Sequence, residues 1–181
     1  MKIKLANVRL AFPAIFEAKS VAAEEPAFSA SLILRPDHPA IAELNAAIDA
    51  VAKEKWGAKA AETLKALRAK GNVCLHSGDE KANHDGFEGN MYVSTRSKTK
   101  PLILDRDKTP LTAADGRPYG GCFVNASLEL WAQDNNFGKR VNAQLKGLQF
   151  YADGDAFSGG APADPDDFDD ISEGADAGAL A

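Results

Sequence analysis

The clearest pattern in the chain is a strict alternation of apolar and polar residues over residues 122–132. One side of this period-two repeat holds only apolar residues, namely Val124, Ala126, Leu128 and Leu130. The other side is polar, with an aromatic residue near each end: Phe123, Asn125, Ser127, Glu129 and Trp131. Because successive side chains of a strand point to opposite faces, the pattern predicts a β-strand with one face in the core and a ring-bearing face outside.

The same division recurs in two other segments. Residues 140–147 place Val141, Ala143, Leu145 and Gly147 inside, and Arg140, Asn142, Gln144 and Lys146 outside. Residues 91–96 place Tyr92, Ser94 and Arg96 outside. The loop 133–139 is rich in turn-forming residues and predicts a hairpin that exposes Phe137 at its tip. Antiparallel pairing would then set Arg140 and Lys146 beside the aromatic ends of the preceding strand.

Between two early strands the apolar spacing changes from two to the period of a helix. Apolar residues recur at helical spacing over residues 40–69, with an interruption near Gly57 and an end at Gly71. This predicts two short helices inserted at about residues 39–70. Trp56 lies on the apolar stripe, so we interpret it as a core residue, with base stacking as the alternative.

Short strand-like segments account for most of the remaining body: 2–10, 28–34, 73–76 and 102–104. We expect Asn7 to mark an irregularity in the first strand and Pro13 to end it. Many short strands separated by Gly, Pro and Asn favour a mainly β fold. The predicted architecture is an OB-like antiparallel barrel with one helical insertion.

Charge divides the chain into two parts. Residues 153–181 carry nine Asp and Glu residues and no Lys or Arg. The remaining residues 1–152 hold 21 basic and 17 acidic residues, a net charge of +4 within a total of −5. We therefore expect a nucleic-acid-binding domain over 1–152 and a disordered acidic tail over 153–181.

Basic residues and aromatic rings occur together on the predicted outer faces. Such a mixture suits unpaired nucleic acid, because rings stack on bases while cations contact phosphates. The candidate DNA-binding residues are Tyr92, Arg96, Lys98, Lys100, Phe123, Trp131, Phe137, Arg140 and Lys146. Two structural alternatives remain: Phe123 and Trp131 could close the ends of the barrel, and residues 96–100 could form a solvated edge that prevents strand pairing.

The tail has a candidate regulatory segment of its own. Two apolar residues interrupt its acidic cluster, which suits docking into a basic groove with an apolar pocket, although a solubilising filler would have the same composition. The residues concerned are Asp164, Asp166, Asp167, Phe168, Asp169 and Asp170, followed by Ile171.

Other classes of function have little support. Cys74 and Cys122 lie far apart in apolar stretches and are expected to be reduced core thiols. No apolar run approaches the roughly 20 residues of a membrane span. Asp105, Asp107 and His84 could be assembled into a metal site, but the chain has no HxxxH, paired CxxC or phosphate-binding GxxxxGK motif. We expect no enzymatic activity, no metal and no cofactor.

Seven segments spread over nearly the whole chain resemble a bacteriophage family of single-stranded DNA-binding proteins with an OB fold. They are Val8–Pro13, Ala52–Gly57, Asp85–Asn90, Leu104–Pro110, Tyr119–Asn125, Trp131–Asn135 and Phe157–Gly160. The resemblance implies a replication or recombination accessory in the cytoplasm of the bacterial host, which coats unpaired DNA. It also implies a tail that occupies the DNA groove when DNA is absent and contacts a polymerase or helicase when DNA is bound. The ending Gly-Ala-Leu-Ala181 departs from the aromatic terminus usual for such tails.

The favoured interpretation is a sequence-independent binder of single-stranded DNA whose tail competes with the DNA. One alternative is a protein-interaction adaptor that acts through the acidic tail. Another is a metal-dependent nuclease centred on Asp105, Asp107 and His84.

Overall fold

The computed structural model describes residues 1–20, 24–157 and 165–172. The strands are β1 (Lys2–Lys19), β2 (Ala27–Leu34), β3 (Leu75–Ser77), β4 (Met91–Ser97), β5 (Leu102–Leu104), β6 (Phe123–Asn135) and β7 (Gly138–Ala152). The helices are α1 (Ala40–Trp56) and α2 (Ala60–Ala69), and short 3-10 turns occur at Gly57–Lys59, Gly78–Lys81, Ala113–Asp115 and Pro165–Asp167.

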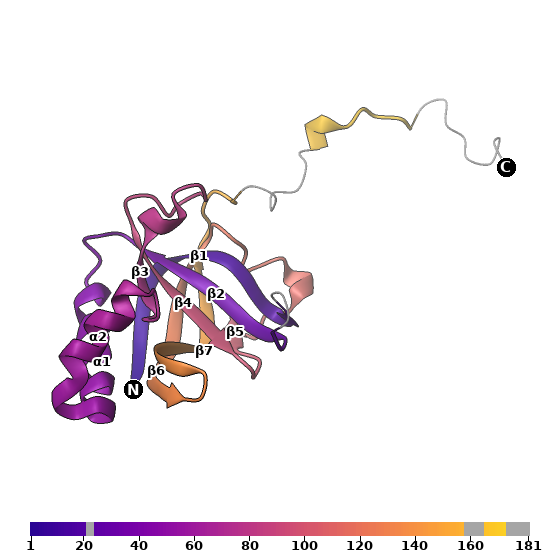
Figure 1. Cartoon of the computed structure of the whole chain (residues 1–181). Coiled ribbons are helices and arrows are strands. Elements are labelled where there is room, and N and C mark those ends of the chain that lie inside the picture. Colours follow the sequence, from indigo (N-terminus) through magenta and orange to yellow (C-terminus); the bar gives the residue numbers. More distant parts are fainter. Residues whose placement is uncertain (21–23, 158–164, 173–181) are drawn as a thin grey trace.

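Five of the strands close into a barrel, as the sequence predicts. The neighbours run β1, β2, β4, β7, β6 and back to β1 (Figure 1). All these pairs are antiparallel except β4 with β7, which meet in parallel where Arg96 faces Gln144. β3 adds to β4, and β5 adds to β7. The closed barrel confirms the predicted fold, and it also distributes the outward residues around a circumference instead of over one open sheet.

The predicted helical insertion is confirmed over residues 40–69. α1 and α2 lie along one side of the barrel (Figure 1). Leu44, Ile48 and Leu64 belong to the same buried cluster as the inward residues of the barrel, so the insertion shares the barrel's core. Gly57 separates the helices with a φ of +56°, a conformation that favours glycine.

The first strand corrects one prediction, because it passes through Pro13 and ends at Lys19. A register shift between Ala11 and Ala14 allows this: the backbone bulges and Phe12 adopts a φ of +48°. A proline is tolerated at a bulge, where the ladder lacks a hydrogen bond. The irregularity expected at Asn7 is confirmed, with a φ of +53° and a register shift between Leu5 and Val8.

The buried thiols match their predicted role. Cys74 and Cys122 are buried and not joined in a disulfide. Burial raises the pKa of the Cys74 thiol to about 12 and that of the Cys122 thiol to about 11. Both cysteines are therefore protonated, weakly reactive core residues at neutral pH.

A short strap continues from β7 across the end of the barrel. The Phe157 backbone N–H donates to the carbonyl oxygen of Gly120 over 3.1 Å, and the Tyr119 hydroxyl donates to Asp153 over 2.7 Å. A Cβ atom on Gly121 would collide with the backbone at Asp155, so glycine permits this close approach. The packed body thus extends through Phe157, five residues beyond the boundary expected at residue 152.

Candidate nucleic-acid interface

The hairpin between β6 and β7 brings three predicted site residues to one end of the barrel. Trp131 pairs with Asn142, and Gln133 pairs with Arg140, so Arg140 lies diagonally across from Trp131. Phe137 is at the tip, with 90% of its surface exposed, and Trp131 is 45% exposed. These three residues and Lys139 form the hairpin group, in which rings and cations are open to solvent.

The turn that presents Phe137 is tighter than expected. The strands reach Asn135 and Gly138, which leaves a two-residue loop in place of residues 133–139. The Asn135 side chain accepts a 2.9 Å hydrogen bond from the Phe137 backbone N–H. Such an Asx turn fixes the backbone, and Gly138 supplies a φ of +107°. Phe137 is therefore exposed on an ordered turn.

The predicted inner and outer faces of β6 are confirmed, but β7 changes phase. Ser127 faces Gly147, while the next residue, Leu128, faces Leu145. Lys146 is thus an extra residue in a bulge, and the buried side continues from Leu145 to Leu148. The exposed Lys146 lies near Glu129, whose pKa is lowered mainly by its hydrogen bond from the N-terminal ammonium and further by Lys146. The expectation that Lys146 stands beside an aromatic end of β6 is wrong.

Phe123, at the other end of β6, has a different environment. Its ring is half-buried and lies 5.7 Å from the Arg9 guanidinium. The strap passes so close that a Cβ on Gly154 would be 3.0 Å from the Phe123 ring. Phe123 therefore packs beneath the strap, far along β6 from the hairpin group.

Tyr92 is on the outer face of β4 as predicted, but it is only 4% exposed. The segment 78–90 folds over this face, and Phe87 meets the Tyr92 ring edge-on at 5.1 Å. His76 from β3 stacks on Tyr92 at 4.8 Å. The expectation that Tyr92 offers a free face to a base is wrong, because a loop and a neighbouring strand cover its ring.

The basic stripe at the end of β4 is exposed, and acidic residues partly neutralise it. Glu24 accepts a 2.6 Å hydrogen bond from Arg96, and Glu25 lies 3.4 Å from the Lys98 ammonium. Both carboxylates belong to the β1–β2 loop. Lys100 is also exposed and has no ion pair among the described residues. Phosphates would have to displace the carboxylates from Arg96 and Lys98.

The sequence reasoning missed an aromatic platform on the bulge of β1, which consists of the rings of Phe12 and Phe87 with Lys81 beside them. Phe12 is 52% exposed and stacks on the buried Phe87 at 5.8 Å. The Lys81 ammonium lies 5.6 Å from both ring centroids, and His84 meets Phe12 edge-on at 5.0 Å. A bulky residue at positive φ is an outlier that often marks a functional position. The sequence signal that could have identified this platform is Phe12, a large aromatic residue directly before Pro13.

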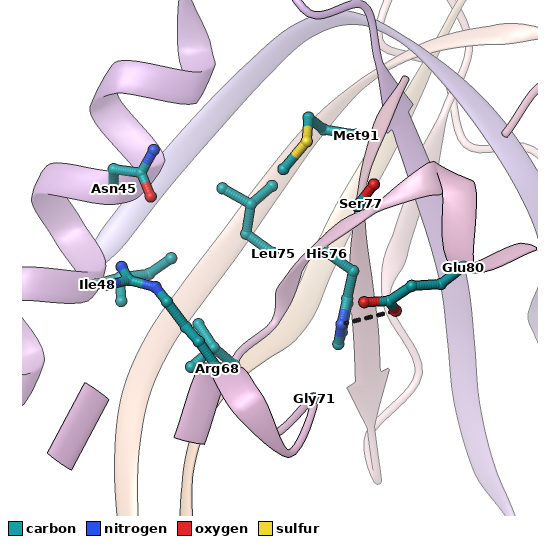
Figure 2. A pocket seen from close by; sticks show the side chains of 10 residues that line it. Asn45, Ile48, Arg68, Gly71, Leu75, His76, Ser77, Glu80 and Met91 are labelled. Atoms are coloured by element: carbon teal, nitrogen blue, oxygen red, sulfur yellow. Dashed lines mark ion pairs between the residues drawn. The ribbon is translucent and has the colours of Figure 1, made fainter. Parts of the chain in front are cut away.

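A cavity of about 240 Å³ lies between the helical insertion and β3. Figure 2 shows Arg68 and His76 among its lining residues, with the His76 ring 3.9 Å from Glu80. Burial lowers the pKa of His76; Glu80 opposes this change, while Lys81 and Arg140 reinforce it. Burial and the nearby cations therefore favour the neutral form of His76 at pH 7.

The carboxylates of the nuclease alternative are already engaged. Arg117 donates a 2.6 Å hydrogen bond to Asp105, which lowers the pKa of that carboxyl. Asp107 accepts hydrogen bonds from Thr109, which likewise lower its pKa. His84 contacts the Phe12 ring instead of these carboxylates. The described residues contain no group of three or more side chains placed to hold a metal ion.

The candidate tail residues are described in part. Asp164 lies outside the described residues, whereas Asp166, Asp167, Phe168, Asp169 and Asp170 lie within residues 165–172. Phe168 and Ile171 are both largely exposed there. Most of the tail expected to be disordered also lies outside the described residues.

Comparison with known proteins decides the family. Residues 1–178 match the family model described as the single-stranded DNA-binding protein of Enterobacter phage Enc34. Protein p50 of Acyrthosiphon pisum secondary endosymbiont phage 1 is 47% identical over 176 residues, 95% of each chain. The chain belongs to the Enc34 family of phage single-stranded DNA-binding proteins. Its sequence resemblance is thereby confirmed.

Solved structures share the barrel. The Enc34 protein in complex with single-stranded DNA has a TM-score of 0.73 at 23% identity, covering 86% of this chain and 88% of that one. Its C-terminal truncation has a TM-score of 0.72 at 25% identity, with coverages of 86% and 88%. The DNA-binding protein gp2.5 of bacteriophage T7 has a TM-score of 0.60 at 10% identity, covering 90% and 98%. These likenesses establish the fold.

Proposed function

We propose that this protein binds single-stranded DNA without sequence preference on the outer surface of its barrel. The supporting observation is the hairpin group, where the exposed rings of Trp131 and Phe137 accompany Arg140 and Lys139. The family's Enc34 member has been solved with single-stranded DNA, and membership makes the same ligand the natural candidate here.

The proposed path begins at the aromatic platform and ends at the hairpin group. Phe12 and Lys81 would receive one part of the strand, since an exposed ring beside an ammonium offers stacking and charge together. Strands β4 and β7, which carry Tyr92 beneath the platform and Arg140 in the hairpin group, are neighbours in the barrel. In OB folds the face of the second and third strands, with the loops that border it, is the usual surface for oligonucleotides.

The cations have a separate role from the rings in this proposal. Arg96, Lys98, Lys100, Arg140 and Lys146 would contact phosphates, and Trp131, Phe137 and Phe12 would stack on bases. Tyr92 and Phe123 would support the surface from beneath, because both rings are packed against other side chains. The mixture favours unpaired strands, whose bases are free to stack.

We further propose that the acidic tail competes with DNA and recruits replication or recombination proteins in the host cytoplasm. Asp166, Asp167, Asp169 and Asp170 could replace phosphates electrostatically, while Phe168 and Ile171 expose apolar surface to a partner. Replacing these four aspartates with asparagine should tighten DNA binding. Within the described residues, no helix combines the length and apolar character needed to cross a bilayer.

The test is fluorescence anisotropy of a labelled oligo-dT at several salt concentrations. Five phosphate contacts would give a slope of about −3.5 in a plot of log K against log salt, at about 0.7 per contact on a single strand. Duplex DNA should compete poorly. An absence of binding to oligo-dT at low salt would contradict the proposed function.

A further inference from the structure

A groove continues from the hairpin end of the proposed path, between helix α2 and the β6–β7 hairpin. It encloses about 540 Å³. One wall is formed by Glu62 on α2 with Lys59 and Lys70 at the two ends of that helix, and the opposite wall carries Phe137, Lys139 and Arg140. Residues 62, 66 and 70 repeat every four positions, so they form one line along the helix.

The groove has an unbalanced charge. Four cations line it, Lys59, Lys70, Lys139 and Arg140, against the single carboxylate of Glu62. In the described part of the chain, none of the four cations lies within ion-pair distance of a carboxylate. Arg96 and Lys98, by contrast, are both paired. Charges of one sign that line a concave surface concentrate the field and attract an anionic ligand.

A hydrogen bond holds the two walls in place. The Trp56 indole at the end of α1 donates to the Asp134 carboxylate over 3.0 Å, which links the helical insertion to the hairpin. Lys59 follows Trp56 in the short turn before α2, and Lys70 caps the end of α2. The spacing of the cations is therefore set by ordered elements.

The groove adjoins the hairpin group, because Phe137, Lys139 and Arg140 belong to both. We propose that it holds phosphates of the single strand as the DNA leaves the barrel, so that the helical insertion forms part of the DNA-binding surface. This inference rests on the proposed function. In this proposal Lys59 and Lys70 contact phosphates of the DNA backbone, and Phe137 stacks on a base at the edge of the groove.

The test compares two double variants of the full chain by oligo-dT anisotropy. Lys59→Gln/Lys70→Gln removes two groove cations, while Lys53→Gln/Lys65→Gln removes two exposed cations of the same insertion that do not line the groove. Two lost contacts should reduce the salt slope by about 1.4. If the variant and the unmodified chain bind equally at 1 M salt, this difference in slope makes the variant bind about 25-fold more weakly at 0.1 M salt. The control variant should retain most of the affinity.

A further variant should change the affinity for oligo-dT in the opposite direction. Glu62→Gln removes the only carboxylate among the described residues that line the groove and should tighten binding, with unchanged thermal melting. The number of nucleotides covered per protomer, from stoichiometric titration, should fall in Lys59→Gln/Lys70→Gln and stay constant in Glu62→Gln. These outcomes do not depend on a variant that disrupts folding.

Two results would overturn the inference. One is equal salt slopes and site sizes in the groove and control variants, while the unmodified chain binds oligo-dT normally; the proposed function would then stand without it. The other is tighter binding by Lys59→Gln/Lys70→Gln that disappears when Asp166, Asp167, Asp169 and Asp170 are asparagine, which would assign the groove to the acidic tail. A chain that does not bind oligo-dT at all would contradict the proposed function itself.

Discussion

Two groups of aromatic rings on outward positions of the barrel have opposite surroundings. Tyr92 is covered by His76 and by Phe87 of segment 78–90, and the rings of Tyr92 and Phe87 form a second small core with Ile33 and Ala11. Trp131 and Phe137 have no such cover. Alternation along a strand therefore says which rings point outward, whereas the loops that fold back decide which rings remain available to a ligand.

The comparison assigns stability to the closed group and binding to the open group. A ring removed from the closed group leaves a cavity among packed neighbours. A ring removed from the open group leaves the fold unchanged and removes a stacking surface. Four predictions separate these roles, from the largest expected effect to the smallest.

Phe87→Ala should lower the free energy of unfolding by about 3–5 kcal/mol, because Phe87 is fully buried against Phe12 and Tyr92. Phe137→Ala should change it by less than about 0.5 kcal/mol. Urea unfolding followed by circular dichroism measures both. A similar decrease in the free energy of unfolding of both variants would contradict the division into a stabilising closed group and a DNA-binding open group.

Trp131→Ala and Phe137→Ala should each weaken oligo-dT binding by about 1–3 kcal/mol, since each loses one stacking surface. Leu102→Ala is the matched control, because Leu102 is apolar and 60% exposed at a distant strand. Anisotropy titration at fixed salt gives the affinities. Equal affinities in all three variants would show that the exposed rings do not contact bases.

Neutralising the β1–β2 loop should have the reverse effect. Glu24→Gln/Glu25→Gln frees Arg96 and Lys98, and the affinity for oligo-dT should rise several-fold, since each exposed ion pair contributes at most about 1 kcal/mol. The salt slope should become steeper. The control Glu54→Gln/Glu88→Gln removes two negative charges elsewhere on the surface. An equal rise in oligo-dT affinity in this control would show that the effect comes from the net charge of the protein and not from the ion pairs of Arg96 and Lys98.

The smallest effect concerns pH. The folded state lowers the pKa of His76, chiefly by burial, so the unfolded chain binds a proton more readily as pH falls through about 6.5. Stability contributed by neutral His76 is present above this value and is lost progressively below it. Unfolding at pH 8 and pH 5.5 should show the decrease, and His76→Gln should make it smaller. An unchanged pH dependence in that variant would contradict the assignment.

Local pattern predicted much of the fold. The buried side of β6, the two helices separated at Gly57 and the mainly β character of the chain follow from residue spacing. Spacing could not foresee the bulges, because one extra residue at Lys146 reverses the inner and outer sides of the strand beyond it. The bulge at Phe12 likewise carries β1 past Pro13.

The site was less predictable than the fold because it depends on contacts between distant segments. Tyr92 is covered by Phe87 and His76, and Arg96 is paired by Glu24, yet none of these relations is visible in a local pattern. Phe123 is likewise covered by the strap that follows β7, a contact that spacing along β6 does not show. The groove at α2 required the tertiary arrangement of the insertion and the hairpin.

The most direct measurement uses Trp56→Phe, which leaves Trp131 as the only tryptophan of the chain. Because this change also removes the indole hydrogen bond to Asp134, anisotropy first compares the oligo-dT affinity of the variant with that of the unmodified chain. If DNA bases stack on the hairpin group, titration with oligo-dT should quench the Trp131 emission to saturation, with an affinity that falls as salt rises. Emission that stays constant while anisotropy shows the oligonucleotide bound would contradict the assignment of Trp131 and the hairpin group to the DNA-binding surface.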